Sequence, residues 1–240
     1  MTQANTKDWT ITNDRFVVFL DIMGFKDFVA RRSHEDVYNM MMNLFDSKSY
    51  VARKFKNVTE PTFMDKELYT ASFSDSIVLF SKDNSAESLD VITSSAAYIM
   101  HDALLKDIPI KGAMAYGKIS VDKENQIYFG QALIDAYLLQ DDVNYYGIVA
   151  HNSIDAFLFG LDPDMPVVQL FLETKTPMKS GKIIHKNVDW FHFLGDFKNS
   201  QIAEKRERLN YYMTSLKRLV SGAARRYIDN TLEVFDLTHS

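Results

Sequence analysis

Short apolar runs alternate along the chain with stretches in which apolar residues recur every three or four positions. The runs with strand character are 15–21, 68–74, 76–81, 108–117, 146–150, 167–173 and 181–185. The stretches with helical spacing are 26–30, Ser33 to about Lys56, 86–105, 131–140 and about 200–229. This alternation predicts an α/β fold on a mixed sheet, and it disfavours a helix bundle or a β-sandwich.

Length and composition bound the domain organisation. A chain of 240 residues with 46% hydrophobic content can bury a full core. No internal repeat or low-complexity linker separates one part of the sequence from another. We therefore expect one domain over residues 1–240, with a core at about 15–150 and a C-terminal extension at about 151–240 packed on it.

Charge and cysteine content exclude several classes of protein. The net charge of −5 and the pI of about 5.7 argue against nucleic acid or an anionic membrane as a partner. The basic stretch 205–226 interleaves its charges with Leu, Tyr and Val at the spacing of a docked amphipathic helix. The absence of cysteine excludes disulfides and thiolate chemistry. With neither a signal-peptide pattern nor a long apolar stretch, the sequence predicts a cytoplasmic protein without a membrane partner.

Two acids interrupt the apolar pattern at comparable places. Asp21 ends the run F-V-V-F-L-D, and Asp75 separates the runs L-Y-T-A-S-F-S and S-I-V-L-F-S. If the first strand lies beside that hairpin, both carboxylates meet at one edge of the sheet. Carboxylates suit hard divalent cations, and two shared acids can hold two ions about 3.5 to 4 Å apart for a displacement at phosphorus. The residues alone leave a plainer alternative open, with Asp21 as a helix cap and Asp75 as a turn residue.

The turn after Asp21 offers a second functional feature. Its residues, Ile22, Met23, Gly24 and Phe25, lead into a helix whose first backbone N–H groups have no partner within the helix. Such groups can bind the phosphates of a nucleoside triphosphate.

These motifs resemble landmarks of the class III nucleotidyl cyclases. F-L-D-I-M-G-F and S-F-S-D-S-I-V-L-F resemble the two metal-binding motifs of the family. I-P-I-K-G-A-M-A-Y-G-K-I, followed by Y-F-G-Q-A-L-I-D-A-Y-L-L, resembles its glycine-containing strand and the Tyr-x-Gly that opens its dimer-interface helix. The four landmarks follow the family order over roughly residues 15–140.

The resemblance implies a fold, metal ligands and an assembly. The expected fold is a ferredoxin-like α+β domain with a mixed, mainly antiparallel sheet and packed helices, extended by C-terminal strands and one long helix. The expected cofactors are two Mg²⁺ or Mn²⁺ ions, bound by the catalytic acids Asp21 and Asp75 and by the backbone of Ile22. The expected active form is a homodimer.

The sequence also departs from the purine cyclases of the family. Where those enzymes read adenine with a lysine and an aspartate, this chain has Tyr69 or Ala71, and Ile127. The family asparagine and transition-state arginine of the interface helix correspond to Ile134 and Leu138. With these losses the chain resembles the Pycsar pyrimidine cyclases of bacterial anti-phage defence. Those enzymes convert UTP or CTP into a cyclic monophosphate that activates a separate effector protein, and UTP is the favoured substrate here.

The remaining site residues are less determined by the sequence. A bulky aromatic side chain would shorten a base pocket against purines, and Tyr50 and Tyr69 are the candidates. Arg53, Lys111 and Lys118 are candidates for the cation that replaces the family arginine. Two other functions stay open: a cyclase-like module that binds nucleotide or a partner without turnover, and a purine cyclase with altered base readout.

Overall fold

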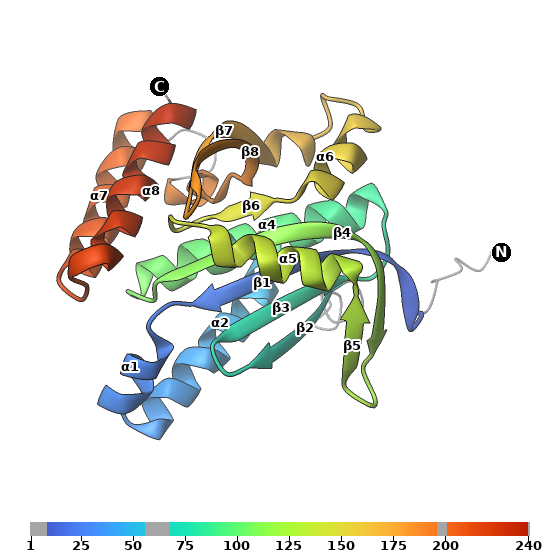
Figure 1. The fold of residues 1–240 in the computed structure, drawn as a ribbon, viewed down its shortest axis with the longest axis horizontal. Helices are drawn as coiled ribbons and strands as arrows, with labels where there is room; N and C mark the ends of the chain where they lie inside the picture. The colour runs from blue at the N-terminus through green and yellow to red at the C-terminus, as the bar shows by residue number, and fades with distance from the viewer. Residues whose placement is uncertain (1–8, 56–67, 196–200, 240) are drawn as a thin grey trace.

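A computed structural model describes residues 9–55, 68–195 and 201–239, which form an α+β fold on one mixed sheet (Figure 1). The strands lie in the order β2-β3-β1-β4-β6-β8-β7, and β5 pairs with β4 outside this path. Every pairing between these strands is antiparallel except that of β4 with β6. The predicted mixed, mainly antiparallel sheet is therefore confirmed. The strands are β1 (Thr12–Ile22), β2 (Leu68–Phe73), β3 (Ser76–Ser81), β4 (Ile110–Asp122), β5 (Ile127–Gly130), β6 (Ile148–Ala150), β7 (Phe171–Met178) and β8 (Gly181–Val188).

Helices cover both faces of this sheet (Figure 1). In the described ranges, none of them is both long and apolar enough to cross a membrane. The α-helices are α1 (Phe25–Arg31), α2 (His34–Phe55), α4 (Ala86–Leu105), α5 (Gln131–Asp142), α6 (Asn152–Phe159), α7 (Ile202–Lys217) and α8 (Arg225–Thr238).

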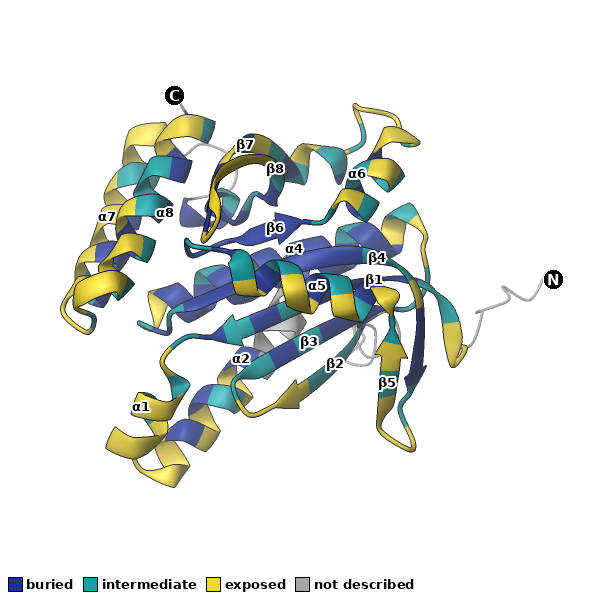
Figure 2. Ribbon diagram, in the orientation of Figure 1, coloured by how far each residue is buried: buried dark blue, intermediate teal, exposed yellow. Residues whose placement is uncertain are grey.

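The central strand β1 distributes its side chains between two apolar clusters. Alternate residues such as Val18 and Leu20 pack into the larger cluster, which includes the buried face of α4. The residues between them, including Val17, face a smaller cluster formed with Ala132 and Ala136 of α5. Because strand side chains alternate between the faces, Asp21 belongs to the face that α5 covers. Figure 2 shows β1 and β4 as largely buried strands, whereas α1, β5 and the outer end of β2 are mostly exposed.

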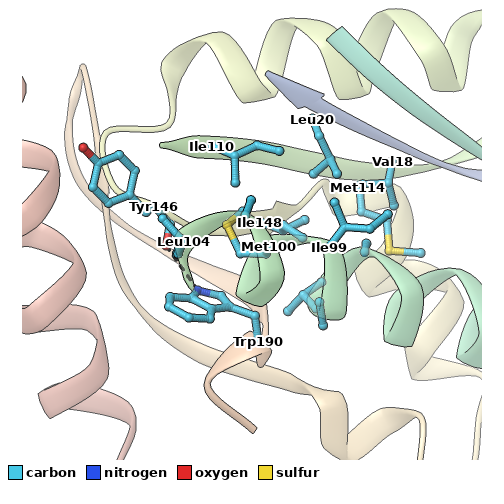
Figure 3. Packing of buried hydrophobic residues seen from close by; sticks show 14 of the residues in the cluster. Val18, Leu20, Ile99, Met100, Leu104, Ile110, Met114, Tyr146, Ile148 and Trp190 are labelled. Atoms are coloured by element: carbon cyan, nitrogen blue, oxygen red, sulfur yellow. Dashed lines mark hydrogen bonds between the residues drawn. The ribbon is translucent and has the colours of Figure 1, made fainter. Parts of the chain in front are cut away.

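The C-terminal part shares the larger core with the elements that precede it. Trp190 is fully buried, and its indole N–H donates a hydrogen bond to the carbonyl oxygen of Tyr146 at 3.2 Å. Figure 3 shows the indole beside Leu104 of α4, with Tyr146 and Ile148 above it. The side chain of Phe235 on α8 belongs to the same cluster. A large buried aromatic residue of this kind contributes several kcal/mol to stability, about 3 to 5 kcal/mol on truncation to alanine.

The structure corrects several sequence-based boundaries. The single long helix expected at 200–229 is wrong, because α7 ends at Lys217 and α8 begins at Arg225. Gly222 lies between them with φ of 62°, a left-handed conformation that cannot continue an α-helix. The strand expected at 167–173 begins only at Phe171, after a short 3₁₀ helix over Val168–Leu170. Neither β5 nor α6 was predicted.

Candidate active site

Asp21 lies one residue before the end of β1, between β3 and β4. Its register partners are Ser76 on β3 and Lys111 on β4. The strand then turns through Met23 and Gly24 into α1. Gly24 has φ of 71°, and the left-handed backbone at this position makes the sharp turn possible. The half-buried carboxylate of Asp21 is therefore held at the end of a central strand, because β1 is paired with a neighbouring strand on each side.

Asp75 lies in the turn between β2 and β3, directly beside this edge. The N–H of Ile22 donates to the carbonyl oxygen of Asp75 at 2.8 Å, so the turn is hydrogen-bonded to the end of β1. Asp75 also precedes Ser76, the register partner of Asp21. The structure thus brings together the two acids that the sequence singled out, at the predicted sheet edge.

The electrostatic surroundings of Asp21 favour a bound cation. Burial raises the pKa of the Asp21 carboxyl above 3.8, Lys111 opposes this rise, and the neighbouring carboxylates of Asp75 and Asp141 reinforce it. Lys179 lowers it again by a smaller amount. A carboxylate that is only partly compensated in this way gains stability from a divalent metal ion. Among the described residues, however, no three His, Cys, Asp or Glu side chains converge as a metal-binding group, so the protein itself offers two carboxylates here.

The predicted phosphate-binding turn is only partly free to bind a ligand. The N–H of Ile22 is used by Asp75, and that of Met23 donates to the carbonyl oxygen of Pro109 at 2.8 Å. The N–H groups of Gly24 and Phe25 donate to no group within the described ranges. The structure therefore restricts the backbone donors of this turn to its second half.

Lys111 lies beside Asp21 but is already engaged. Its ammonium donates to the carbonyl oxygens of Gln140, Asp141 and Val143 at 2.8, 3.0 and 3.2 Å. These carbonyls belong to the end of α5, where a cation is favoured by the helix dipole. Since an ammonium has three N–H donors, Lys111 has none left for a phosphate. We therefore interpret Lys111 as a residue that positions α5 against β1.

Lys118, another predicted cation, is not brought to Asp21, and the predictions for Arg53 and Tyr50 fall on side chains outside the described residues. Lys118 pairs with Asp14, seven residues along β1 from Asp21, which corresponds to about 23 Å in an extended strand. It also projects from the opposite face of the sheet, because strand residues alternate. Arg53 and Tyr50 lie on α2 in a part of the helix whose side chains are outside the described residues.

A cavity of about 720 Å³ lies on the same face of the sheet as Asp21. Tyr69 and Ala71 line it, and so does Ser76, the register partner of Asp21. Ile127 does not: it is half exposed on β5, while its neighbours Gln126 and Tyr128 line the cavity. Of the predicted base-pocket residues, Tyr69 and Ala71 therefore line a cavity next to the acids, and Ile127 does not.

Tyr69 is fixed at this cavity by other aromatic residues. Its hydroxyl lies 2.6 Å from that of Tyr128, and its ring stacks on Phe80 with 6.1 Å between the centroids. The ammonium of Lys123 lies over the Tyr69 ring at 5.1 Å from the centroid. The ring is therefore held in place before any ligand binds.

No sequence feature singled out Lys179, which the C-terminal part of the chain brings close to Asp21. Lys179 follows β7, and its ammonium pairs with the Asp141 carboxylate at 2.9 Å. Its backbone N–H donates to the carbonyl oxygen of Asp142 at 2.7 Å, which attaches the β7–β8 turn to the end of α5. The side chain stays half exposed and is close enough to lower the pKa of Asp21. A lysine beside a glycine-containing turn has no sequence feature that links it to an acid so far away in the chain.

Comparison with solved structures shows the fold of cyclase domains. The chain is similar to the guanylate cyclase domain of RhGC from Catenaria anguillulae, in complex with GTP, with a TM-score of 0.51, 15% identity, and coverage of 73% of this chain and 96% of that one. It is equally similar to the catalytic core of a rhodopsin-guanylyl cyclase with converted specificity, in complex with ATPαS, with a TM-score of 0.51, 16% identity, and coverage of 75% and 98%. No protein-family model matches the chain, and no curated protein matches it. The likeness confirms the class III cyclase fold that the motifs implied.

The raised pKa of the Asp21 carboxyl predicts that this residue destabilises the metal-free protein at neutral pH. A carboxyl whose pKa is raised in the folded state costs stability once pH exceeds the folded value, and the cost vanishes below the ordinary value of 3.8. In EDTA, Asp21→Asn should therefore raise the free energy of unfolding at pH 7, and this gain should shrink as pH falls toward 3.8. Chemical unfolding at several pH values measures it.

The control for this experiment is Asp164→Asn, which changes an exposed acid outside the site. It should leave the stability unchanged across the same pH range. Adding Mn²⁺ should raise the melting temperature of the wild type and not that of Asp21→Asn. Equal Mn²⁺ stabilisation of both proteins would remove Asp21 from the metal site.

Proposed function

We propose that the protein is a nucleotidyl cyclase that converts UTP or CTP into the 3′,5′-cyclic monophosphate and pyrophosphate. The observation that carries the proposal is the placement of Asp21 and Asp75 at one sheet edge, within a fold similar to cyclase domains. Carboxylates in this arrangement can share divalent ions around a phosphate that undergoes displacement.

The donor atoms fit Mg²⁺ or Mn²⁺, which both prefer oxygen ligands. Asp21, Asp75 and the backbone carbonyl of Ile22 would hold the ions, and the substrate phosphates would complete the coordination. When bound, such ions lower the pKa of the ribose 3′-hydroxyl and neutralise charge on the triphosphate. The 3′-oxygen then attacks the α-phosphorus, and the bond from that phosphorus to the pyrophosphate oxygen breaks.

The remaining groups of the chain bind and orient the substrate. The N–H groups of Gly24 and Phe25 would hold phosphate oxygens at the start of α1. The position of the family arginine is occupied here by Leu138. We assign the role of that arginine, which is to bind the triphosphate, to the half-exposed ammonium of Lys179. Lys111 would keep α5 and its attached β7–β8 turn in register with Asp21 through its three bonds to the helix end.

The pyrimidine preference is supported by the shape of the cavity beside Tyr69. The rings of Tyr69, Phe80 and Tyr128 form one side of it, so an aromatic surface stands where purine cyclases have a base-reading lysine. Such a surface can stack on a one-ring base while leaving less room for two rings. Gln126 adds an amide that both donates and accepts hydrogen bonds, as a pyrimidine edge requires.

The homodimer is supported by apolar residues around the same cavity. Phe73 is 86% exposed, and Ile134, Tyr137 and Leu138 on α5 are 50%, 51% and 61% exposed. Phe73, Ile134 and Tyr137 also line the cavity. A second copy of the chain on this face would bury these side chains and enclose the substrate.

The resemblance to Pycsar cyclases gives the proposed reaction a context. The product would be a second messenger in anti-phage defence, recognised by a separate effector protein. One alternative keeps specific support: Ile134 and Leu138 replace the two polar groups of the family helix, which also fits a module that binds nucleotide without turning it over.

A four-nucleotide assay tests activity and base class together. With Mn²⁺ and each of UTP, CTP, ATP and GTP in turn, the wild type should form cyclic product from a pyrimidine nucleotide. Asp21→Ala and Asp75→Ala should each lose at least about a hundredfold in rate, because a metal ligand contributes several kcal/mol to transition-state stabilisation. Asp164→Ala is the matched acid control and should keep full activity. Binding without product would favour the non-catalytic module, and product from ATP or GTP alone would reject the pyrimidine assignment.

Tyr69→Ala should weaken base selection. Loss of a stacking ring costs about 1 to 3 kcal/mol per base, so pyrimidine kcat/KM should fall roughly tenfold or more while some purine turnover appears. Tyr69→Phe keeps the ring and loses only the hydroxyl contact with Tyr128, so it should retain the preference. If the alanine variant keeps the wild-type ranking of the four nucleotides, Tyr69 does not form the base pocket.

Leu138→Glu should separate the dimer, because a charge on α5 would be buried against the partner. Light scattering should report a monomer, and cyclase activity should be lost at the same protein concentration. Phe159→Glu changes a residue on α6 that is 93% exposed, and it should affect neither property. A wild type that is monomeric and fully active at nanomolar concentration would contradict the proposed assembly.

A further inference from the structure

A second cavity, of about 520 Å³, lies between α1 and the segment that joins α7 to α8. It shares no lining residue with the cavity beside Tyr69, and neither Asp21 nor Asp75 lines it. In Figure 1, α1 and the two C-terminal helices lie on the side of the sheet where β1 ends. The cavity is thus next to the proposed metal site but separate from its acids.

The rim of this cavity is rich in guanidinium groups. Arg31 is the last residue of α1 and Arg32 follows it, and Arg218 directly follows α7. Asp27 and Asp107 also line it, so the lining side chains leave one positive charge in excess. Within the described ranges, the guanidinium groups of Arg31 and Arg218 form no hydrogen bond or ion pair, although the backbone N–H of Arg218 donates to the carbonyl oxygen of Ser215 at 3.1 Å. Their charges are therefore available to a ligand, and guanidinium groups match phosphate oxygens in pairs.

The floor of the cavity is apolar and partly aromatic. Phe28, Tyr146, Leu216 and Val220 line it. The guanidinium of Arg32 lies over the Phe28 ring at 4.2 Å from the centroid, which holds that arginine beside the floor. An apolar floor with a few charged groups at its rim is the usual composition of a small-molecule site, and the volume falls in the range of such sites, roughly 300 to 1,000 Å³.

The cavity also adjoins the backbone that fixes Asp21. Met23, Gly24 and Pro109 line it, and the N–H of Met23 donates to the carbonyl oxygen of Pro109 at 2.8 Å. Met23 follows Asp21 by two residues, and Pro109 precedes Lys111 by two. A ligand in the cavity would therefore contact a hydrogen-bonded pair that lies two residues from Asp21 and from Lys111.

We propose that this cavity is a regulatory site for a small phosphorylated ligand with an aromatic body, such as a nucleoside monophosphate. The phosphate binds Arg31 and Arg218, and the aromatic body lies against the partly buried ring of Phe28, above the buried side chain of Tyr146. Occupation changes metal affinity at Asp21 through the Met23–Pro109 pair. The coupling rests on the metal site of the proposed function, whereas binding of the ligand does not.

The binding experiment uses adenosine 5′-monophosphate, because a purine monophosphate is not a proposed substrate. Calorimetry on the full chain in EDTA, with Asp21→Asn as background, excludes metal-dependent binding at the acids. Arg31→Ala and Arg218→Ala should each weaken binding at least about tenfold. Asp27→Asn should tighten it by removing a like charge, and Lys26→Ala, on α1 but outside the cavity, should change nothing. Adenosine and inorganic phosphate alone should each bind more weakly than the monophosphate.

The coupling experiment measures Mn²⁺ affinity of the wild type with and without the monophosphate. The dissociation constant should change at least about fivefold, and the change should be absent in Arg31→Ala.

Both arginines are exposed, so these variants should fold, which their melting temperatures check. Undetectable binding at millimolar ligand, or binding that ignores both arginines, would overturn the site. Purely competitive displacement by nucleoside triphosphate would overturn it as a separate site. A protein without cyclase activity that still passes both experiments would reject the proposed function and keep this inference.

Discussion

The pairing of β1 between β3 and β4 is the constraint on which the site depends. It places Asp21 opposite Ser76 on one side and Lys111 on the other, and it ties Ile22 to Asp75. A shift of this register by one residue would move Asp21 to the opposite face of the sheet. The apolar side chains that alternate along β1 oppose that shift, since it would also move Val18 and Leu20 out of the larger cluster and onto the face covered by α5. The packing of the core therefore determines the position of the acids.

Around Asp21 the charges form a connected group. The Lys111 ammonium is buried against the end of α5, and Lys179 pairs with Asp141 on that same helix end. Burial lowers the pKa of Lys111, as it raises that of Asp21, so each residue opposes the shift of the other. Such opposed shifts are common where charged groups are held for chemistry instead of stability. The C-terminal extension contributes to this group and is not merely attached to the domain.

The sequence was informative where residue types mark a strand end or a turn, and uninformative where a side chain bonds to backbone groups. Asp21 and Asp75 could be paired in advance because a strand end and a hairpin turn leave few ways to arrange two carboxylates. Lys111 was one of three candidates for the missing cation, and the sequence could not show that it bonds three backbone carbonyls, because a helix end leaves no mark on residue types. Lys179 was missed for the same reason. The long C-terminal helix was mispredicted because helical apolar spacing continues past Lys217, and the break depends on the conformation of Gly222.

The central place of β1 also has a consequence for biosynthesis. This strand is translated before the other described elements, yet both of its sheet neighbours are made much later, and β4 ends only at Asp122. The core beneath it waits longer still for Trp190 and for Phe235 on the last helix. Pairings so distant in sequence form slowly, and strands without partners are prone to aggregate in the meantime. A nascent chain of this protein must therefore keep an apolar strand protected until β4 and the later parts of the core have been translated.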